Sequence, residues 1–236
     1  MPQLLVSIRN LEEAQIARDS EIDWIDAKEP SNGPLGKPEN RILNQIAIEI
    51  NGKSPLSAAM GEISDYKYCI LEGSTIDSYS IIKFGTARTD FPRISSLLAE
   101  IIQDSKRSTQ SLVLAAYADS QRANSPSPGF FPEFCANEGM EYLLIDTFVK
   151  DSSDLFSWLS IQELEKIRDR CEKLGIKLAL AGRLTIDKFP IIQLLDPHVV
   201  GLRGAVCEEG IRDNRISPER ISLWKSSLKS VNGGSN

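Results

Sequence analysis

The sequence predicts a single α/β domain with the fold of a (β/α)8 TIM barrel. Its 236 residues fall within the roughly 200 to 250 residues that one such barrel occupies. Short apolar runs rich in β-branched residues occur eight times along the chain. Segments in which apolar residues return every three or four positions separate most of these runs. Because parallel strands need a crossover after each one, this alternation favours a barrel of parallel strands.

Each predicted element follows from its local pattern. The eight predicted strands are LLVSI (4–8), IDWIDAK (22–28), PLSAAMGE (55–62), YSIIKFGTA (79–87), SLVLAAYAD (111–119), EYLLIDTF (141–148), KLALAGRL (177–184) and HVVGLRGAV (198–206). The clearest helical segments are NLEEAQIARDS (10–20), NRILNQIAIEIN (40–51), PRISSLLAEIIQDSK (92–106) and SIQELEKIRDRCEKLG (160–175). Pro38 and Pro218 fit the first turns of helices, and Gly175 fits a helix end. The links after the third and seventh strands have weaker helical periodicity.

An open, doubly wound α/β sheet is the main alternative to the barrel. The sequence contains neither a G-x-G-x-x-G motif after its first strand nor a G-x-x-x-x-G-K-[ST] motif, so both common nucleotide-binding fingerprints are absent. We therefore predict one catalytic TIM-barrel domain over residues 1–230, followed by a disordered tail over residues 231–236.

The composition argues against several classes of partner. The formal net charge is -6 and lysines and arginines form no cluster, so we expect no nucleic-acid partner. No apolar run is long enough to span a membrane, and the N-terminal apolar stretch is too short for a signal peptide. We therefore expect a cytoplasmic protein without a membrane partner. Four scattered cysteines and one histidine form no metal-binding pattern, and we expect neither a metal nor a cofactor.

Charged residues occur at the ends of three predicted strands. The second strand ends with Asp26 and Lys28, which share one face because side chains alternate with a period of two. The fourth strand contains Lys83, and the sixth ends with Asp146, with Lys150 four residues later. Since TIM barrels place their active sites at the C-terminal ends of the strands, we expect these five residues to converge in one site.

Lysines gathered in an apolar setting indicate covalent chemistry with a carbonyl compound. A neutral lysine amine adds to an aldehyde or ketone and forms a Schiff base. A second ammonium about 6 Å away, at an effective dielectric constant near 20, destabilises the charged lysine by roughly 2.8 kcal/mol, or about two pKa units. Carboxylates beside the amine can carry protons to and from the intermediates. The alternative is that each lysine and carboxylate form an ion pair that closes the top rim of the barrel.

Glycines and arginines at the ends of the last two predicted strands suggest a phosphate site. The seventh strand ends with Gly182 and Arg183, and the eighth contains Arg203 and Gly204. Loops after these strands commonly bind phosphate through backbone N–H groups that glycine exposes, with a cation alongside. The alternative is that the glycines only allow helices to pack closely.

These features together resemble the (5-formylfuran-3-yl)methyl phosphate synthases of methanofuran biosynthesis. The resemblance covers nearly the whole chain, and its most specific part is the D-x-K-x-P…G-x-L-G segment. It rests on LLVSIRNLEEA, IDAKEPSNGPLG, IIKFGTA, LLIDTFVKD, LALAGRL and VGLRGAVC, in the family's order and spacing. It implies a barrel lyase that acts on carbon–oxygen bonds of phosphates. Such an enzyme joins two molecules of glyceraldehyde 3-phosphate, loses phosphate and water, and closes the furan ring.

The resemblance also implies roles for individual residues. Lys28 corresponds to the Schiff-base lysine. The family's charged site residues fall on Asp26, Lys28, Lys83, Asp146 and Lys150. Arg183 departs from the family, which usually has a small hydroxyl residue there, and the loop EEGIRDNR (208–215) is more acidic than the family's glycine-rich loop.

Two other functions stay open on the residues alone. One is a class I aldolase that acts on another phosphorylated sugar, and the other is a non-catalytic barrel that binds a phosphosugar. The family resemblance implies a phosphorylated three-carbon sugar as the partner. The sequence leaves open an assembly of identical chains.

Overall fold

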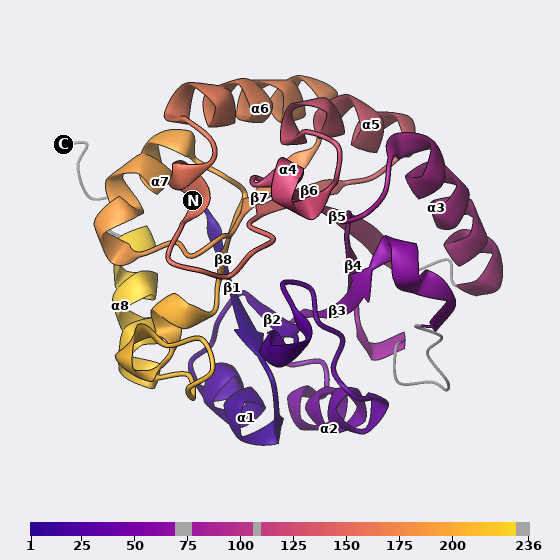
Figure 1. Cartoon of the computed structure of the whole chain (residues 1–236). Helices are drawn as coiled ribbons and strands as arrows, with labels where there is room; N and C mark the ends of the chain where they lie inside the picture. Colours follow the sequence, from indigo (N-terminus) through magenta and orange to yellow (C-terminus); the bar gives the residue numbers. More distant parts are fainter. Residues whose placement is uncertain (69–76, 106–109, 230–236) are drawn as a thin grey trace.

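The computed structural model describes residues 1–68, 77–105 and 110–229, and these form a closed barrel of eight parallel strands (Figure 1). The strands pair in sequence order, and the last strand pairs with the first. The strands are β1 (Gln3–Ile8), β2 (Trp24–Ala27), β3 (Leu56–Glu62), β4 (Ile81–Gly85), β5 (Ser111–Tyr117), β6 (Tyr142–Asp146), β7 (Lys177–Leu180) and β8 (Val199–Leu202). The predicted fold class is confirmed.

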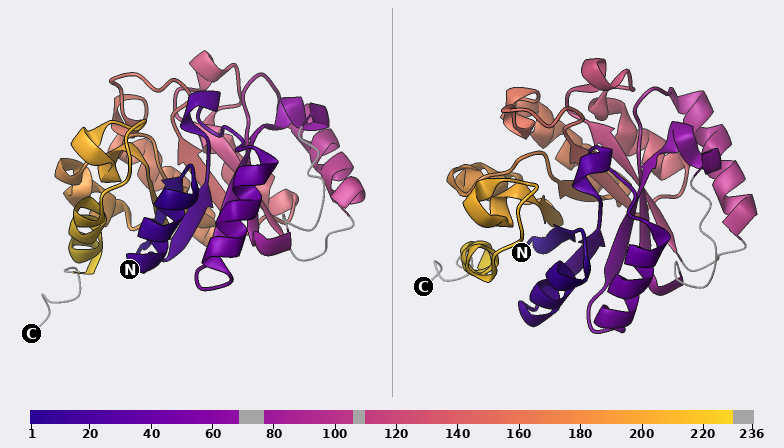
Figure 2. Two further views of the ribbon diagram at one scale, coloured as in Figure 1. Left: turned by 90° about the horizontal axis from the view of Figure 1, so that it is seen from below. Right: turned by 60° about the horizontal axis from the view of Figure 1, so that its bottom comes forward.

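Helices surround the barrel, as the side views in Figure 2 show. They are α1 (Leu11–Asp19), α2 (Asn40–Ile50), α3 (Phe91–Ser105), α4 (Ser120–Ala123), α5 (Phe131–Asn137), α6 (Ile161–Leu174), α7 (Phe189–Leu195) and α8 (Pro218–Lys229). After β3, the connection begins with a 3-10 helix, η2 (Ile63–Tyr68). The side chains of Ser160 and Glu163 cap the start of α6 reciprocally, and Gly175 ends it with a φ of 71°.

The seventh and eighth strands are shorter than predicted. The predicted strand 177–184 ends at Leu180, because Gly182 and Arg183 have φ values of 97° and 55°, which lie outside the β region. The predicted strand 198–206 ends at Leu202, after which a 3-10 helix, η7 (Gly204–Val206), begins. The candidate phosphate residues therefore lie in loops that follow these strands, at the C-terminal mouth of the barrel.

Two apolar clusters hold the fold together. The larger cluster packs the outer faces of the strands against the helices. The smaller one fills part of the barrel interior with Ile81, Val113, Leu144 and their neighbours. Toward β7 and β8 the cavity is lined by smaller residues, including Ala181 and Gly201. The interior therefore leaves open space at the mouth.

The first and last strands, β1 and β8, pair with each other and close the barrel. The Gln3 N–H donates to the His198 carbonyl over 2.8 Å, and the pairing continues from Gln3 beside Val199 to Val6 beside Leu202. The predicted tail, residues 231–236, lies outside the described ranges. Among the described residues, no helix combines the length and the apolar character that a membrane span requires.

Candidate active site

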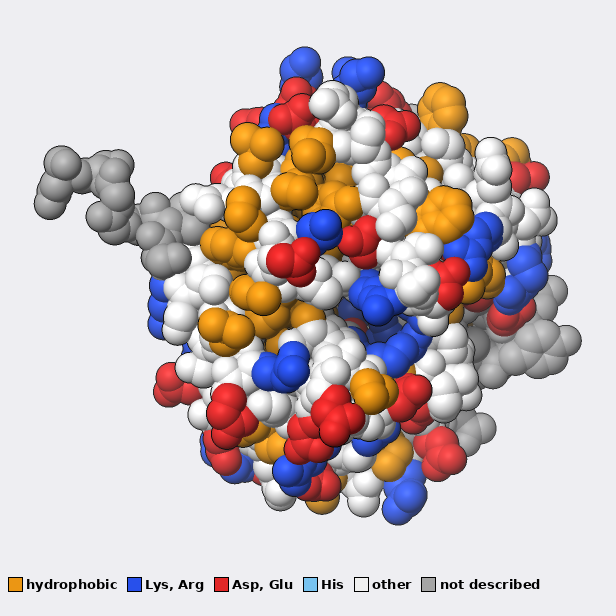
Figure 3. Space-filling view, turned by 60° about the vertical axis from the view of Figure 1, so that its left-hand side comes forward, with side chains coloured by type: hydrophobic (Ala, Val, Ile, Leu, Met, Phe, Trp, Pro, Cys, Tyr) orange, Lys and Arg blue, Asp and Glu red, His pale blue; other side chains and the backbone are white. Residues whose placement is uncertain are grey.

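The C-terminal ends of the strands surround a cavity of about 620 Å³. Figure 3 shows a hollow in the surface in which lysine and arginine side chains gather. All of the charged strand-end residues singled out in the sequence line this cavity: Asp26, Lys28, Lys83, Asp146 and Lys150. So do the four candidate phosphate residues, Gly182, Arg183, Arg203 and Gly204. The barrel thus brings both sets of residues to one place.

Asp26 on β2 is a buried carboxylate that binds side chains from three other strands. The strand register places it between Ser7 on β1 and Ser57 on β3. The Ser7 hydroxyl donates to Asp26 Oδ2, and the Ser57 hydroxyl donates to Oδ1, each over 2.8 Å. The ammonium of Lys83 on β4 lies 2.7 Å from the same Oδ1. Both carboxylate oxygens therefore have partners, and Asp26 fixes the position of the Lys83 charge.

Lys28 follows the last residue of β2 and is 8% exposed. Its Nζ lies 3.8 Å from Asp146 Oδ2. Burial lowers the pKa of Lys28 from 10.5 to about 7, with Lys150 and Lys83 acting in the same direction and Asp146 and Asp26 opposing them. A large share of the Lys28 amines is therefore neutral near pH 7, which is the state in which a lysine acts as a nucleophile.

Asp146 is the last residue of β6, and its carboxylate connects two lysines. Its Oδ1 accepts hydrogen bonds from Thr147 N over 2.7 Å and from Lys150 Nζ over 2.6 Å, while Oδ2 faces Lys28. Burial works against ionisation of Asp146. However, Lys150 and Lys28, together with these hydrogen bonds, outweigh burial and keep the pKa of Asp146 below its usual value. Asp146 is therefore ionised beside a partly neutral amine.

A buried carboxylate that the sequence prediction missed supports the loop after β6. Asp119 Oδ1 accepts from Phe148 N over 2.6 Å, and Oδ2 accepts from Val149 N over 3.0 Å. Asp119 therefore fixes the turn that directs Lys150 toward Asp146. The sequence pattern that could have found it is the one that found Asp26 and Asp146. Asp119 is the last residue of the predicted strand 111–119, and the other two also lie near strand ends.

The loop after β7 presents an exposed arginine beside a glycine. Arg183 Nη1 donates to the Asp151 carbonyl over 2.7 Å, which joins the loops after β6 and β7. A Cβ on Gly182 would lie 3.1 Å from a Thr147 side-chain carbon, so the glycine permits close approach of these loops. The backbone of this loop and the Arg183 guanidinium lie at the rim of the cavity.

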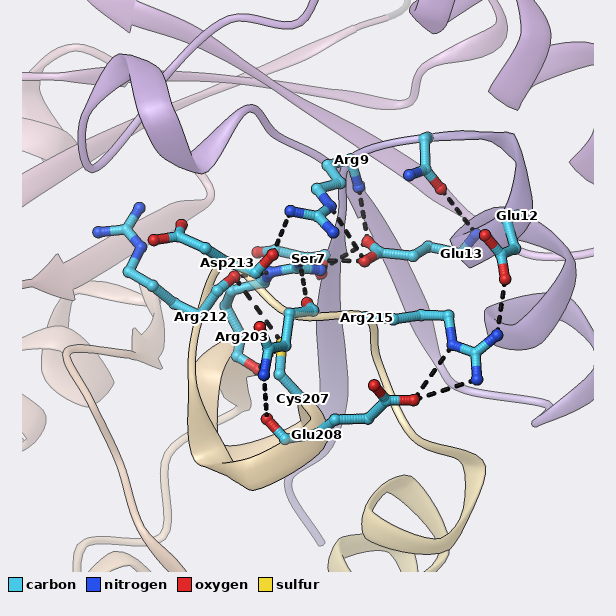
Figure 4. A network of polar contacts seen from close by, with 12 residues as sticks. Ser7, Arg9, Glu12, Glu13, Arg203, Cys207, Glu208, Arg212, Asp213 and Arg215 are labelled. Carbon is cyan, nitrogen blue, oxygen red and sulfur yellow. Dashed lines mark hydrogen bonds and ion pairs between the residues drawn. The ribbon is translucent and has the colours of Figure 1, made fainter.

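Arg203 uses all of its donors within the protein (Figure 4). Nε donates to the Arg212 carbonyl over 2.8 Å, and Nη1 donates to the Ser7 carbonyl and to Glu13 Oε2 over 3.0 and 2.6 Å. Nη2 donates to Glu13 Oε1 and to the Asn214 carbonyl over 3.0 and 2.9 Å. A guanidinium has five N–H donors, and these five hydrogen bonds use all of them. Arg203 therefore has no donor left for a phosphate, which differs from the prediction. In this arrangement Arg203 holds the loop after β8.

We expect Lys28→Met to make the protein more stable at pH 7, and this gain to shrink as the pH rises. The folded pKa of Lys28 is about 7 and the ordinary value is 10.5, so between these values the unfolded chain binds more protons and wild-type stability increases with pH. Below about pH 7 Lys28 is charged in the folded wild type as well, so the wild type bears the whole free-energy cost of burying that charge. Urea unfolding of both proteins from about pH 7 to 9 should show the difference in unfolding free energy falling by roughly 1 kcal/mol per pH unit. A constant difference would contradict the assigned pKa.

Side chains that could bind a metal ion are scattered over residues 1–68, 77–105 and 110–229. Within these ranges no three His, Cys, Asp or Glu side chains are grouped so that they could hold a metal ion.

The family of the chain is shown by comparison with known sequences. A family model described as 4-HFC-P synthase matches residues 4–225. The chain belongs to this family. A relative from Methanosarcina barkeri, named (5-formylfuran-3-yl)methyl phosphate synthase, is 31% identical over 227 residues, which cover 93% of this chain and 96% of the relative. A relative of the same name from Methanocaldococcus jannaschii is 31% identical over 235 residues, covering 96% and 99%. The resemblance seen in the sequence is confirmed.

Solved structures outside the 4-HFC-P synthase family share the fold. Phosphoribosyl anthranilate isomerase from Thermotoga maritima superposes with a TM-score of 0.67 at 15% identity, covering 98% of this chain and 100% of that one. The 3-hexulose-6-phosphate synthase from Salmonella typhimurium gives a TM-score of 0.61 at 16% identity, covering 96% and 99%. At these identities the likeness extends to the TIM barrel alone.

Proposed function

We propose that this member of the 4-HFC-P synthase family converts two molecules of glyceraldehyde 3-phosphate into (5-formylfuran-3-yl)methyl phosphate, a step of methanofuran biosynthesis. The names of its relatives support the product. The observation that carries the chemistry is the buried amine of Lys28, whose pKa burial lowers to about 7. The atoms balance with the release of one phosphate and two water molecules. Because phosphate leaves by cleavage of a carbon–oxygen bond, the proposed enzyme is a lyase.

Lys28 is the proposed nucleophile. Its neutral amine adds to the carbonyl carbon of one triose phosphate, and loss of water from the carbinolamine leaves an iminium ion. The cationic nitrogen withdraws electrons from the adjacent carbon and makes its proton more acidic. Removal of that proton gives an enamine, whose carbon attacks the carbonyl of the second triose. The burial that keeps Lys28 partly neutral thus supports the first step.

Asp146 and Lys150 are the proposed proton carriers. Asp146 is ionised and lies 3.8 Å from Lys28 Nζ, so it can accept a proton from the carbinolamine or from the carbon beside the iminium. Lys150 Nζ lies 2.6 Å from Asp146 Oδ1 and can donate a proton to a leaving oxygen. Lys83, held in place by Asp26, directs its ammonium group at the cavity and can stabilise oxyanions that develop nearby. Gly182, Arg183 and Gly204 are the proposed contacts for one phosphate.

We expect glyceraldehyde 3-phosphate, supplied alone, to yield a furan aldehyde phosphate. Mass spectrometry should identify the product, and one inorganic phosphate should appear for each product molecule. A non-furan sugar phosphate would instead favour the class I aldolase alternative. Binding of the triose phosphate without turnover and without a covalent adduct would favour the non-catalytic barrel.

A further inference from the structure

We infer that Arg212, in the loop 208–214 after β8, binds a phosphate group of the substrate and forms a second phosphate subsite at the mouth of the cavity. The identity of the phosphate ester as a triose phosphate rests on the proposed function. Two triose phosphates that react with each other bring two phosphate groups to one site. Gly182, Arg183 and Gly204 offer contacts for one of them, so the other needs a separate partner.

Arg212 lines the cavity and is half-buried. Its Nη2 donates to the Pro30 carbonyl over 2.9 Å and to the Gly33 carbonyl over 3.4 Å, so the side chain reaches the loop after β2. Within the described residues, its Nε and Nη1 have no hydrogen-bond or ion-pair partner. These atoms carry three N–H donors, enough for a bidentate contact with phosphate oxygens. In Figure 4 the guanidinium of Arg212 extends away from the polar network around Arg203.

The carboxylates of the site, Asp26 and Asp146, form no ion pair with Arg212 within the described residues. Asp26 is paired with Lys83, and Asp146 contacts Lys150. No carboxylate in the described part of the chain lies within ion-pair distance of the Arg212 guanidinium. A partly desolvated guanidinium without a carboxylate partner favours an anionic ligand, and arginine matches the geometry of a phosphate monoester.

The loop that carries Arg212 is held in place from behind. Arg203 donates to the backbone carbonyls of Arg212 and Asn214, and Arg9 donates to the carbonyl of Asp213. Arg203 is itself fixed by two hydrogen bonds to the buried carboxylate of Glu13. A cation whose backbone is fixed loses less conformational freedom when it binds a ligand. Arg203 is therefore a positioning residue for Arg212.

Titration calorimetry with glycerol 3-phosphate tests this subsite without involving Schiff-base chemistry, because this probe has a phosphate but no carbonyl. We expect Arg212→Gln to weaken its binding roughly 10- to 100-fold, as for the loss of a charge-assisted contact. Arg212→Lys should lie between, because it retains the charge but loses the bidentate geometry. The matched control is Arg215→Gln, three residues further along the chain. Arg215 pairs with Glu12 and Glu208 and does not line the cavity, so this variant should bind as the wild type does.

Equal affinity of wild type and both Arg212 variants would overturn the inference, and so would failure of the wild type to bind glycerol 3-phosphate. The Arg212→Lys variant keeps the test decisive if the glutamine variant does not fold. Borohydride trapping of the wild type with glyceraldehyde, which lacks phosphate, separates the two proposals. An Arg212-dependent affinity combined with no trapping would preserve the phosphate subsite and remove the Schiff base.

Discussion

We expect Lys28→Arg to eliminate both the covalent adduct and the turnover of glyceraldehyde 3-phosphate. Arginine keeps a positive charge that can hold phosphate, but it stays protonated and cannot add to a carbonyl. Removing a nucleophile that nothing replaces costs on the order of 10⁴-fold or more in kcat. With the wild type, borohydride should fix a three-carbon phosphate on the peptide that contains WIDAK (24–28). The substitution therefore separates covalent use of this position from electrostatic use.

The neighbouring lysines provide the controls for this experiment. Lys83→Ala and Lys150→Ala should slow the reaction but leave part of the trapping, since these residues tune the amine and move protons in the proposed scheme. An adduct on Lys83 or Lys150 would reassign the nucleophile within the same cluster. Full activity of Lys28→Arg, together with no adduct on any lysine, would leave the Schiff-base mechanism without support.

We expect Asp146→Asn and Lys150→Met to shift the acid limb of the pH–rate profile in opposite directions. The rate of the wild type should rise with pH through about pH 7, because only the neutral Lys28 amine reacts in the proposed scheme. Asp146 raises the pKa of Lys28, so its neutralisation moves the limb to lower pH. Lys150 lowers the pKa of Lys28, so its removal moves the limb to higher pH. Asp146→Asn should also reduce kcat/KM by roughly 10²- to 10⁴-fold, since it removes the proposed base.

The limb is measured as kcat/KM across about pH 5 to 9, which reports the free enzyme. Asp146 should add no second limb in this range, because its pKa is lowered. Arg215→Gln again serves as the control and should leave the profile unchanged. Shifts in the same direction for both variants would mean that the two residues do not act on Lys28 through their charges.

The barrel and its charged cluster could be predicted because both depend on local patterns. Alternating strands and helices predict the fold. Residues that follow the strands of such a barrel lie together at its C-terminal mouth. Asp26, Lys28, Lys83 and Asp146 were found in this way, since a charge near the end of an apolar run stands out in the sequence. The same rule also applies to Asp119, but the hydrogen bonds that give it a role come from the backbone N–H groups of Phe148 and Val149, which no sequence pattern displays.

The roles of the arginines could not be predicted in this way. Arg203 follows a strand beside a glycine, as a phosphate-binding residue would. Its side chain instead donates to Glu13, which lies 190 residues earlier in the chain. Arg212 lies in an irregular loop without periodicity. Its approach to the cavity depends on the backbone contacts that Arg203 makes and on the carbonyl of Pro30. Such contacts exist only once the barrel has closed.

The distance in sequence between Glu13 and Arg203 has a consequence for synthesis of the protein on the ribosome. Glu13 emerges early, but its buried cation is made 190 residues later. Until Arg203 is made, the buried carboxylate has only Arg9 as a cationic partner among the described residues, so we expect β1 and α1 to reach their final packing only after β8 has been added. The loop of Arg212 is translated later still. A nascent chain therefore lacks a complete candidate site until β8 and the segment after it have left the exit tunnel.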